Sequence, residues 1–508
     1  MTGAVIIFAI VLYMASVIYV GMRLSSQNKS TDDFYLGGRR LGPLVTAMSA
    51  EASDMSSWLL MGLPGVALAG LVAGNGTFAE SVWTAIGLAI GTYLNWIIVA
   101  KRLRIYSEKI DANTIPDFFS NRYGDKSGAL LALSAVIIIV YFVPYTASGF
   151  AAVGKLFNSL FNLDYHASMV VGAAVIAIYT ILGGFLAAST TDFIQGVIMS
   201  IAMLVVFFYG VSTAGGMDTI MANTSVVKNY FSLSGPDGSY GFLPVASTLA
   251  WGLGYFGMPH ILLRFMAIED RKKLTLARRV ACIWVVISMA LAIFIGVMGY
   301  SFAKTEGILG GNFDPERIIV YIASSLSKNN LFCAFGAGVI ISGILASIMS
   351  TSDSQMLAAA SSVSENIFRR FWFKNMSEKA QMIFARLTVF LITIIGIVFA
   401  WNSNSSVFRI VSFAWAGFGA AFGPLMLFSL FWKRTTKSGA LAGVVVGGVM
   451  VFVWKFGVAK LGGLFSIYEL LPAFLLSSLA IVIFSLASKA PDKEIVDAFE
   501  AVNAEMKK

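Results

Sequence analysis

The 508-residue sequence contains little charge and almost no histidine or cysteine. Only 12% of its residues are Asp, Glu, Lys or Arg, and it has two histidines and two cysteines. Soluble globular proteins carry about 25% charged residues. Cys282 and Cys333 give no disulfide framework, and so few His and Cys residues argue against a zinc or copper site. The scarcity of ionisable groups therefore argues against a water-soluble protein.

Hydrophobic residues make up 57% of the chain, and the mean hydropathy is +0.79. Apolar stretches of about 20 residues recur along its whole length, and each is long enough to cross a hydrocarbon core of about 30 Å. The stretch from Ala4 to Met22 lacks a basic leading segment and a small-residue cleavage site, so we expect a retained helix rather than a signal peptide. The sequence predicts an all-α polytopic membrane protein.

We predict thirteen membrane-spanning segments from the apolar stretches. They cover residues 4–22, 42–73, 76–99, 128–158, 166–186, 190–214, 241–263, 276–303, 318–352, 380–400, 407–431, 438–457 and 464–487. The second segment is too long and too broken for one regular helix. The ninth is expected to continue through Arg370 into water.

Basic residues gather in alternate loops, which accounts for the net charge of +9. This pattern sets membrane orientation and gives no reason to expect a nucleic-acid partner. The basic loops hold Arg23, Lys29, Arg39, Arg40, Lys101, Arg102, Arg104, Lys109, Arg264, Arg271, Lys272, Lys273, Arg278, Arg279, Arg369, Arg370, Lys374, Lys379, Lys433, Arg434 and Lys437. The loop 215–240 has only Lys228. The N-terminus is therefore expected outside, and the helix-prone tail 488–508 in the cytoplasm.

Two predicted spans contain helix breakers and polar residues. "SAEASDMSSWLLMGLPG", Ser49 to Gly65, holds Glu51, Asp54 and a Gly-Leu-Pro-Gly break, and "WGLGYFGMPH", Trp251 to His260, holds three glycines and a proline. Freed backbone groups are tolerable at membrane depth only around a protein-lined cavity. The breaks lie five spans apart, so the second copy would be inverted. Such a pair indicates an inverted-repeat transporter with a central site.

A third stretch, "SGILASIMSTSDSQML", places hydroxyl oxygens on one helical face. Ser347, Ser350, Thr351 and Ser354 follow helical spacing, and Asp353 adds a carboxylate. These oxygens suit a hard cation. The segment "TTDFIQG" places Asp192 near the expected membrane edge.

Each feature also has a purely structural interpretation. Ser and Thr commonly pack or bond their own helix backbone in membranes, and Asp54 can serve as a helix cap. Intramembrane acids are nevertheless functional by default. In combination, the breaks, the hydroxyl stripe and the acids favour alternating-access transport coupled to a cation.

Four motifs then show a family resemblance that covers nearly the whole chain. They are "ASDMSSWLLMGLPG", "YTASG" at Tyr145 to Gly149, "WGLGYFGMPHILLRFMA" and "MSTSDSQML". The chain resembles the sodium/solute symporter family, most closely its bacterial sodium/proline symporters. The resemblance implies a leucine-transporter-like fold of two inverted five-helix repeats. The helix at 4–22 would precede repeats at 42–214 and 241–431, and two helices at 438–487 would follow them.

The resemblance also implies ion ligands at matching positions. The sodium site would use the backbone oxygens of Ala52, Met55 and Ser347 and the hydroxyls of Ser350 and Thr351. Asp54 would support sodium coupling. A second cation site would use Asp192, Asp353 and Ser354, together with Ser350. Sodium is the expected coupling ion, and no catalytic residues are implied.

For the solute, the matching positions predict a proline site. They are Ser56, Trp58, Tyr145, Trp251, Tyr255, Met258 and Pro259. A carboxylate suits the positive end of a broken helix, and a secondary ammonium suits aromatic faces, a contact worth about 0.5–2 kcal/mol. We therefore expect sodium-coupled import of L-proline across a bacterial-type plasma membrane. No obligate protein partner is evident.

Three residues depart from the pattern expected for proline symporters. Ser57 replaces a usual Gly, Met258 a usual Gln, and Glu51 a usually neutral residue. Another small neutral amino acid or organic solute is therefore an alternative substrate. A non-transporting sensor on the same fold is a second alternative. An intramembrane hydrolase would need a nucleophile–base pair, and the motifs offer none.

Overall fold

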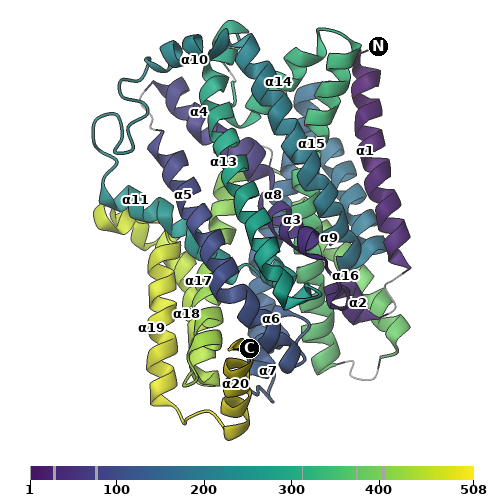
Figure 1. Cartoon of the computed structure of the whole chain (residues 1–508), viewed down its shortest axis with the longest axis vertical. Coiled ribbons are helices and arrows are strands. Elements are labelled where there is room, and N and C mark those ends of the chain that lie inside the picture. Colours follow the sequence, from purple (N-terminus) through teal and green to yellow (C-terminus); the bar gives the residue numbers. More distant parts are fainter. Residues whose placement is uncertain are drawn as a thin grey trace.

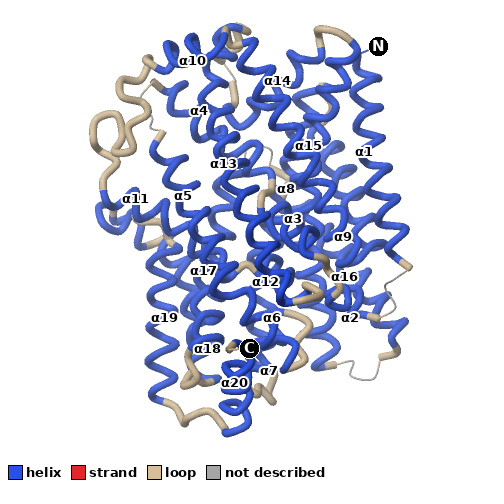
Figure 2. Tube along the Cα trace, viewed as in Figure 1, coloured by secondary structure: helices blue, strands red, loops and turns tan. Residues whose placement is uncertain are grey.

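The computed structural model describes residues 2–26, 30–74, 78–311, 313–372, 376–402 and 407–507. In this part of the chain the regular structure is helical (Figure 2), and the one β-bridge pairs Leu41 with Ile268. Lys29 and Lys374, which the orientation argument uses, lie outside the described residues. The all-α prediction is confirmed.

The helices stack side by side along the long axis of the molecule, with α10 at one end and α20 at the other (Figure 1). The N-terminal half contains α1 (Thr2–Ser25), α2 (Thr31–Leu36), η1 (Gly37–Arg39), α3 (Pro43–Asp54), η2 (Trp58–Gly62), α4 (Leu63–Ala73), α5 (Ala79–Leu94), η3 (Asn95–Ala100), α6 (Lys101–Lys109), α7 (Ile115–Arg122), α8 (Ala129–Phe161), α9 (Tyr165–Thr213) and α10 (Gly216–Thr224). The C-terminal half contains α11 (Phe242–Leu249), η4 (Ala250–Gly257), α12 (Pro259–Ala267), η5 (Arg271–Lys273), α13 (Leu274–Thr305), η6 (Pro315–Arg317), α14 (Ile318–Ser327), α15 (Leu331–Ser361), η7 (Ser362–Arg369), α16 (Glu378–Phe399), α17 (Val407–Phe431), α18 (Lys437–Phe456), η8 (Val458–Leu461), η9 (Gly463–Ser466), α19 (Leu470–Ala487) and α20 (Lys493–Met506).

The second predicted span is broken at Met55, seven residues before Gly62, the first of the glycines and proline that suggested a break. α3 ends at Asp54, Met55 leaves the helical region at φ −76° and ψ 62°, and the chain bends by 59° before α4. The stretch Gly62 to Gly65 continues the second half-helix instead. There the Leu63 amide bonds to the Trp58 carbonyl in the wide π-turn η2, and Pro64 lies in the first turn of α4, where its missing N–H is tolerated.

The other broken span has three parts. α11 passes into the 3₁₀-helix η4, Met258 is extended at φ −76° and ψ 109°, and Pro259 opens α12. The glycines of η4 permit close contacts, because a Cβ on Gly254 would lie 2.0 Å from Trp415 Nε1 and one on Gly257 would lie 2.2 Å from the Phe418 carbonyl. The predicted break is therefore present, and packing requires its small residues.

A parallel β-bridge joins the outer ends of the two broken spans. The Leu41 amide donates to the Ala267 carbonyl (3.1 Å), and the Glu269 amide donates to the Leu41 carbonyl (2.9 Å). The Arg39 guanidinium adds bonds to the carbonyls of Met266 and Ala112, both at 2.7 Å. Hydrogen bonds thus connect the start of α3 with the end of α12.

Within the described residues, ten helices are long and apolar enough to cross a membrane, and the bent pair of α3 with η2 and α4 gives an eleventh. Eleven is two fewer than the thirteen spans predicted from the sequence, for two reasons. The expected spans 166–186 and 190–214 form one 49-residue helix, α9, which Gly184 interrupts at φ 63° and ψ −168°. The expected span 241–263 is divided into α11, η4 and α12. The count of thirteen spans stays a prediction.

The predicted ninth span, 318–352, is wrong in its bounds. It comprises a separate helix, α14, and the first part of α15, whose N-cap Asn330 accepts from the Cys333 amide at 2.8 Å. α15 and η7 then run on to Arg369. Arg369 and Arg370 are exposed, as expected for the extension.

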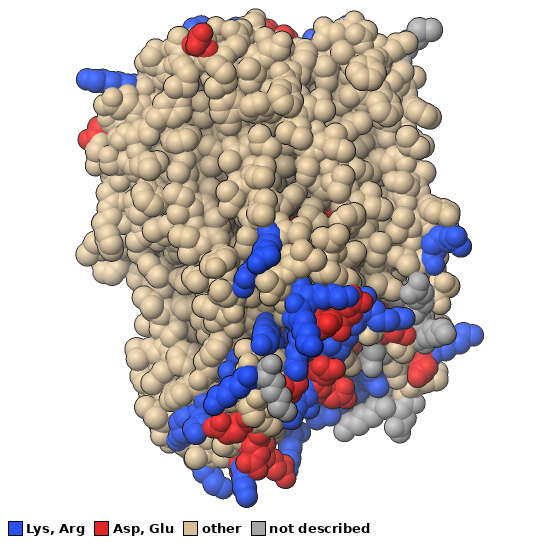
Figure 3. All heavy atoms as spheres, viewed as in Figure 1, with Lys and Arg blue, Asp and Glu red and all other residues tan. Residues whose placement is uncertain are grey.

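Charged side chains gather at the end of the molecule that holds α2, α6 and α20 (Figure 3). α20 lies against this basic surface rather than free in water. Lys433 pairs with Glu500 at 3.1 Å, Arg271 pairs with Glu505, and Phe499 and Val502 are buried. The predicted tail helix is confirmed, and it covers the ends of several spans.

The backbones of α5 and η4 are in direct contact where the two elements cross. Three glycines permit this close approach: Gly87 and Gly91 in α5, and Gly252 in η4. A Cβ on Gly91 would lie 2.3 Å from the Gly252 carbonyl oxygen, and one on Gly252 would lie 2.2 Å from the Gly87 carbonyl oxygen. A side chain here must push the broken helix away from α5.

We predict that Gly91→Leu destabilises the fold by about 1–3 kcal/mol or more, the usual cost of overpacking. The measurement is the thermal unfolding midpoint of the purified protein in detergent. Gly21→Leu in α1 is the matched control, because a Cβ there has no neighbour within 4 Å. Equal midpoints for the two variants would contradict the close crossing.

Candidate functional site

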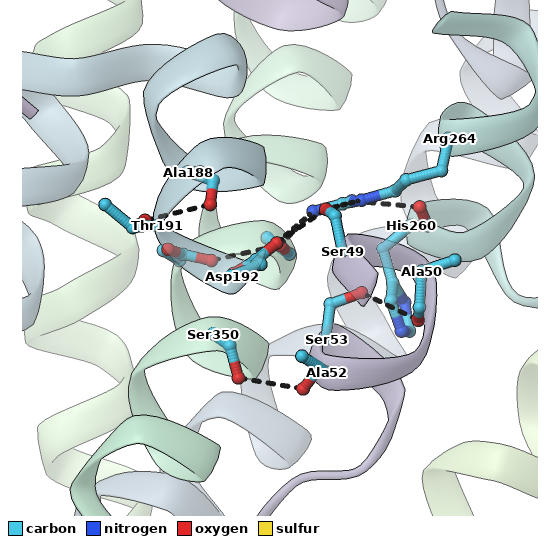
Figure 4. Close-up of polar contacts among 12 residues, drawn as sticks. Ser49, Ala50, Ala52, Ser53, Ala188, Thr191, Asp192, His260, Arg264 and Ser350 are labelled. Atoms are coloured by element: carbon cyan, nitrogen blue, oxygen red, sulfur yellow. Dashed lines mark hydrogen bonds and ion pairs between the residues drawn. The ribbon is translucent and has the colours of Figure 1, made fainter. Parts of the chain in front are cut away.

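The broken end of α3 meets the hydroxyl stripe of α15. The Ser350 hydroxyl donates to the Ala52 carbonyl oxygen at 2.8 Å (Figure 4), and it lies 3.3 Å from the Ser347 carbonyl oxygen. The Thr351 hydroxyl donates to the same Ser347 carbonyl at 3.1 Å. Four of the five oxygens predicted to bind sodium therefore lie in one continuous group. The fifth belongs to Met55, the first residue after α3.

This group has the properties that a hard monovalent cation requires. Its residues are at most 2% exposed, and its oxygens are neutral carbonyls and hydroxyls. The last carbonyls of α3 carry the negative end of its dipole and lack continuing helix partners. Among the described residues no group of three or more His, Cys, Asp or Glu side chains could hold a metal. An ion bound by these carbonyl and hydroxyl groups would rest on neutral oxygens.

Asp54 connects the two broken helices. Its Oδ2 accepts a hydrogen bond from the Tyr255 hydroxyl of η4 at 2.6 Å, and its backbone carbonyl accepts from Trp58 Nε1 at 3.3 Å. Its Oδ1 has no partner among the described residues. Tyr255 is itself held by Asn95, whose side-chain amide donates to its carbonyl at 3.0 Å. Asp54 is thus a link between the ion group and the aromatic groups.

Aromatic side chains from both breaks face one another. The rings of Trp58 and Trp251 lie 6.3 Å apart, and the Tyr145 hydroxyl lies 3.5 Å from the Ser56 hydroxyl. These four residues and Tyr255 are at most 5% exposed. The structure therefore brings together five of the seven residues predicted to bind the solute.

Met258 and Pro259 lie at the opposite end of η4 from Trp251, where α12 begins. Both are fully within the protein interior. The next residue, His260, packs its ring 5.5 Å from that of Phe142. Among the described residues, no side-chain hydrogen bond or ring contact joins Met258 to the aromatic group, so its role in solute binding stays a prediction.

The residues of the predicted second cation site also lie together, but around an arginine. Arg264 of α12 is 1% exposed and forms an ion pair with Asp192 of α9 at 3.2 Å. Its guanidinium also donates to Ser354 of α15, and Ser354 donates to Asp353 at 3.0 Å. Figure 4 shows Arg264 reaching Asp192 between α3 and α9.

Two placements predicted for this region are wrong. Arg264 lies inside α12 rather than in a basic loop, because α12 continues to Ala267. Asp192 does not reach water at a membrane edge, since it is buried, and Asp353 is buried as well. Both acids avoid an unpaired buried state through polar partners, and Tyr179 supplies a further hydroxyl to Asp353. Buried charge requires such compensation.

Glu51 and Ser57 occupy distinct positions at the break. Glu51 is 1% exposed and accepts from Trp96 Nε1 at 2.9 Å, while its Oε2 has no partner among the described residues. Glu51 is therefore an interior residue that faces η3, and an exposed position for it is excluded. Ser57 is buried and precedes η2.

Two functional candidates were missed in the sequence, Arg264 and Trp415. Trp415 of α17 donates to the Trp251 carbonyl at 2.7 Å and packs edge-on against Tyr255 at 5.0 Å. Nothing in the local sequence of α17 distinguishes Trp415 from lipid-facing tryptophans. Arg264 carried a signal, because it follows Pro259 by little more than one helical turn.

Comparisons with known proteins agree with this geometry. The family model described as "Sodium:solute symporter family" matches residues 34–447. The chain is 42% identical to a sodium/proline symporter of Haemophilus influenzae, with 96% of each chain covered. It is 41% identical to the high-affinity proline transporter PutP of Bacillus subtilis, covering 94% of this chain and 98% of the relative. It is 40% identical to the sodium/proline symporter of Escherichia coli, covering 97% and 95%.

Solved structures show the fold. A sodium-coupled sialic acid symporter in a substrate-bound outward-open state superposes with a TM-score of 0.80 at 18% identity, covering 96% of this chain and 99% of the other. A nucleobase-cation-symport-1 family transporter in a closed conformation gives 0.56 at 14% identity, covering 92% and 98%. The leucine-transporter-like fold class is confirmed, and the chain belongs to the sodium:solute symporter family.

Proposed function

We propose that this chain is a sodium-coupled symporter that imports L-proline into the cell by alternating access. One observation carries the proposal. The Ser350 hydroxyl of α15 donates a hydrogen bond to the Ala52 carbonyl of α3, and two residues further along the chain Asp54 accepts one from Tyr255 of η4. This arrangement joins an ion position and a solute position through one pair of broken helices. The three relatives named above each match at least 94% of the chain and are proline transporters, and two of them are sodium/proline symporters.

Sodium is held in this proposal by Ala52, Met55, Ser347, Ser350 and Thr351. These residues belong to α3 and its C-terminal end and to α15, so the ion would bridge two packed elements. Asp54 supplies a carboxylate next to the ion group without being one of its ligands. An ion that draws α3 onto α15 also positions Asp54 and Tyr255, and ion binding thereby raises the affinity for the solute by reciprocal coupling.

The proline site is proposed to lie between the aromatic groups of the two breaks. Ser56, Trp58, Tyr145, Trp251 and Tyr255 would contact the ring and the ammonium, while the first turn of α12 at Pro259 offers the positive end of a dipole to the carboxylate. Met258 adds an apolar, flexible side chain at this turn. Another small neutral amino acid is the second candidate, and Met258 is the residue that favours it.

Transport would proceed by moving the broken helices. The five solute residues are almost completely buried, so a solute enters or leaves only when one side of the helix bundle opens. Inward sodium flow would provide about 2.3 kcal/mol per charge per 100 mV, plus the concentration term.

The function is tested by uptake into liposomes that contain the purified protein. An imposed inward sodium gradient is expected to drive accumulation of labelled proline, and unlabelled proline is expected to compete with it. A panel of neutral amino acids and small organic solutes run in parallel identifies the substrate. Accumulation of a different solute, with no competition by proline, would contradict the substrate assignment. Absence of any sodium-driven uptake or counterflow would favour a sensor.

We predict that Thr351→Ala raises the sodium concentration for half-maximal uptake by about 10- to 100-fold. This corresponds to the loss of one oxygen ligand to a charge, about 1.5–3 kcal/mol. Thr351→Ser is the matched control, because it keeps the hydroxyl. The proline concentration for half-maximal uptake at saturating sodium is expected to change little in either variant. An unchanged sodium dependence in Thr351→Ala would remove Thr351 from the ligand set.

The proposed orientation places the N-terminus outside and α20 in the cytoplasm. The concentration of charged side chains around α2, α6 and α20 supports it (Figure 3). A cysteine at Lys507 should then resist an impermeant thiol reagent in intact cells and react after permeabilisation, while one at Thr2 should react in both. The background must lack Cys282 and Cys333. The reverse labelling pattern would overturn the orientation.

A further inference from the structure

The Arg264 guanidinium lies at the centre of a buried polar cluster that no part of the proposed transport mechanism uses. Its Nε donates to the Ser49 hydroxyl at 2.9 Å, and its Nη1 donates to the His260 carbonyl at 2.9 Å. Its Nη2 contacts both Asp192, at 3.2 Å, and the Ser354 hydroxyl. Figure 4 shows the contacts with Ser49, Asp192 and His260. One guanidinium thereby joins α3, α9, α12 and α15.

Two serines connect this cation with two carboxylates. Ser49 accepts from Arg264 and donates to Asp192 Oδ2 at 2.7 Å. Ser354 accepts from Arg264 and donates to Asp353 Oδ1 at 3.0 Å. The guanidinium contacts both serine hydroxyls and Asp192 directly, and it reaches Asp353 through Ser354, so the cation is an integral part of the cluster.

The remaining groups form an oxygen-rich cation site. They are the carboxylates of Asp192 and Asp353, the hydroxyls of Ser49 and Ser354, and the His260 carbonyl. Oxygen atoms of these kinds also suit a hard cation such as Na⁺. Two buried carboxylates stay ionised only beside a compensating positive charge. Arg264, paired with Asp192 at 3.2 Å, is the cation at this place.

We propose that Arg264 is a tethered cation that takes the place of a second coupling ion. With the guanidinium present, the Asp192–Asp353 group binds no sodium, and the ion position at Ala52 and Ser350 is the only one that loads. Arg264 is thus the residue that sets the number of sodium ions in each transport cycle. The proposal rests on the proposed sodium-coupled function, but it concerns ion number rather than solute identity.

The test is equilibrium binding of ²²Na⁺ to the purified protein in detergent, which counts ions without needing a solute. The wild-type protein is expected to bind one sodium ion. Arg264→Ser is expected to bind two, because a small hydroxyl replaces the cation and the acids remain. Arg264→Lys is the matched control, since it keeps a positive charge, and it is expected to bind one. Adding Asp192→Asn to Arg264→Ser should return the count to one.

Two ions bound by the wild type or by Arg264→Lys would overturn the proposal, as would one ion bound by folded Arg264→Ser. Folding is checked by the thermal unfolding midpoint, and sodium is expected to raise that midpoint further in Arg264→Ser than in the wild type. If Arg264→Ser does not fold, Arg264→Gln takes its place, because it removes the charge but keeps amide donors for Ser49 and Asp192; it is likewise expected to bind two ions, and a count of one would overturn the proposal.

Transport measurements separate this proposal from the proposed function. In liposomes, the ratio of sodium ions to solute is expected to rise from one in the wild type to two in Arg264→Ser. Failure to accumulate proline would reject the proposed substrate, while the ²²Na⁺ counts would stand. A wild-type count of two with normal proline uptake would reject only the role of Arg264.

Discussion

Backbone carbonyls that lose their helical partners inside a membrane must find others within the protein, and this constraint organises the centre of the molecule. α3 stops at Asp54 in the middle of the bundle, which leaves its last carbonyls without continuing helix turns. The Ser350 hydroxyl of α15 reaches one of them, at Ala52. This hydrogen bond between a broken helix and an intact one accounts for three features: the hydroxyl stripe of α15, the early bend of the chain and the position of Asp54.

Charge in the interior obeys a related rule, because the buried acids at the centre have polar partners. Asp54 accepts from Tyr255, Glu51 accepts from Trp96, and Asp192 pairs with Arg264. These bonds join elements far apart in the sequence. The polar groups therefore help to specify how the two halves of the molecule fit together.

Most of the fold and much of the proposed ion position were predictable from local patterns. The period of Ser347, Ser350 and Thr351 identifies a polar helix face in an apolar sequence, and broken spans stand out for the same reason. The location of the break within Ser49–Gly65 was not predictable, because Gly62 and Pro64 are strong helix breakers in isolation but fit a wide π-turn here. Arg264 was misplaced for a similar reason, since its burial depends on Asp192, Ser49 and Ser354, which approach only in the folded bundle. Partners distant in sequence leave no local pattern.

The bridge between Leu41 and Ile268 has a mechanical consequence. It fastens the start of α3 to the end of α12, and Arg39 adds a second attachment at Met266. The two half-helices are therefore joined on the side where charged residues gather. Each broken span loses its helical conformation at one residue, Met55 or Met258. A passage that opened on that side would require both half-helices to tilt together about these two residues.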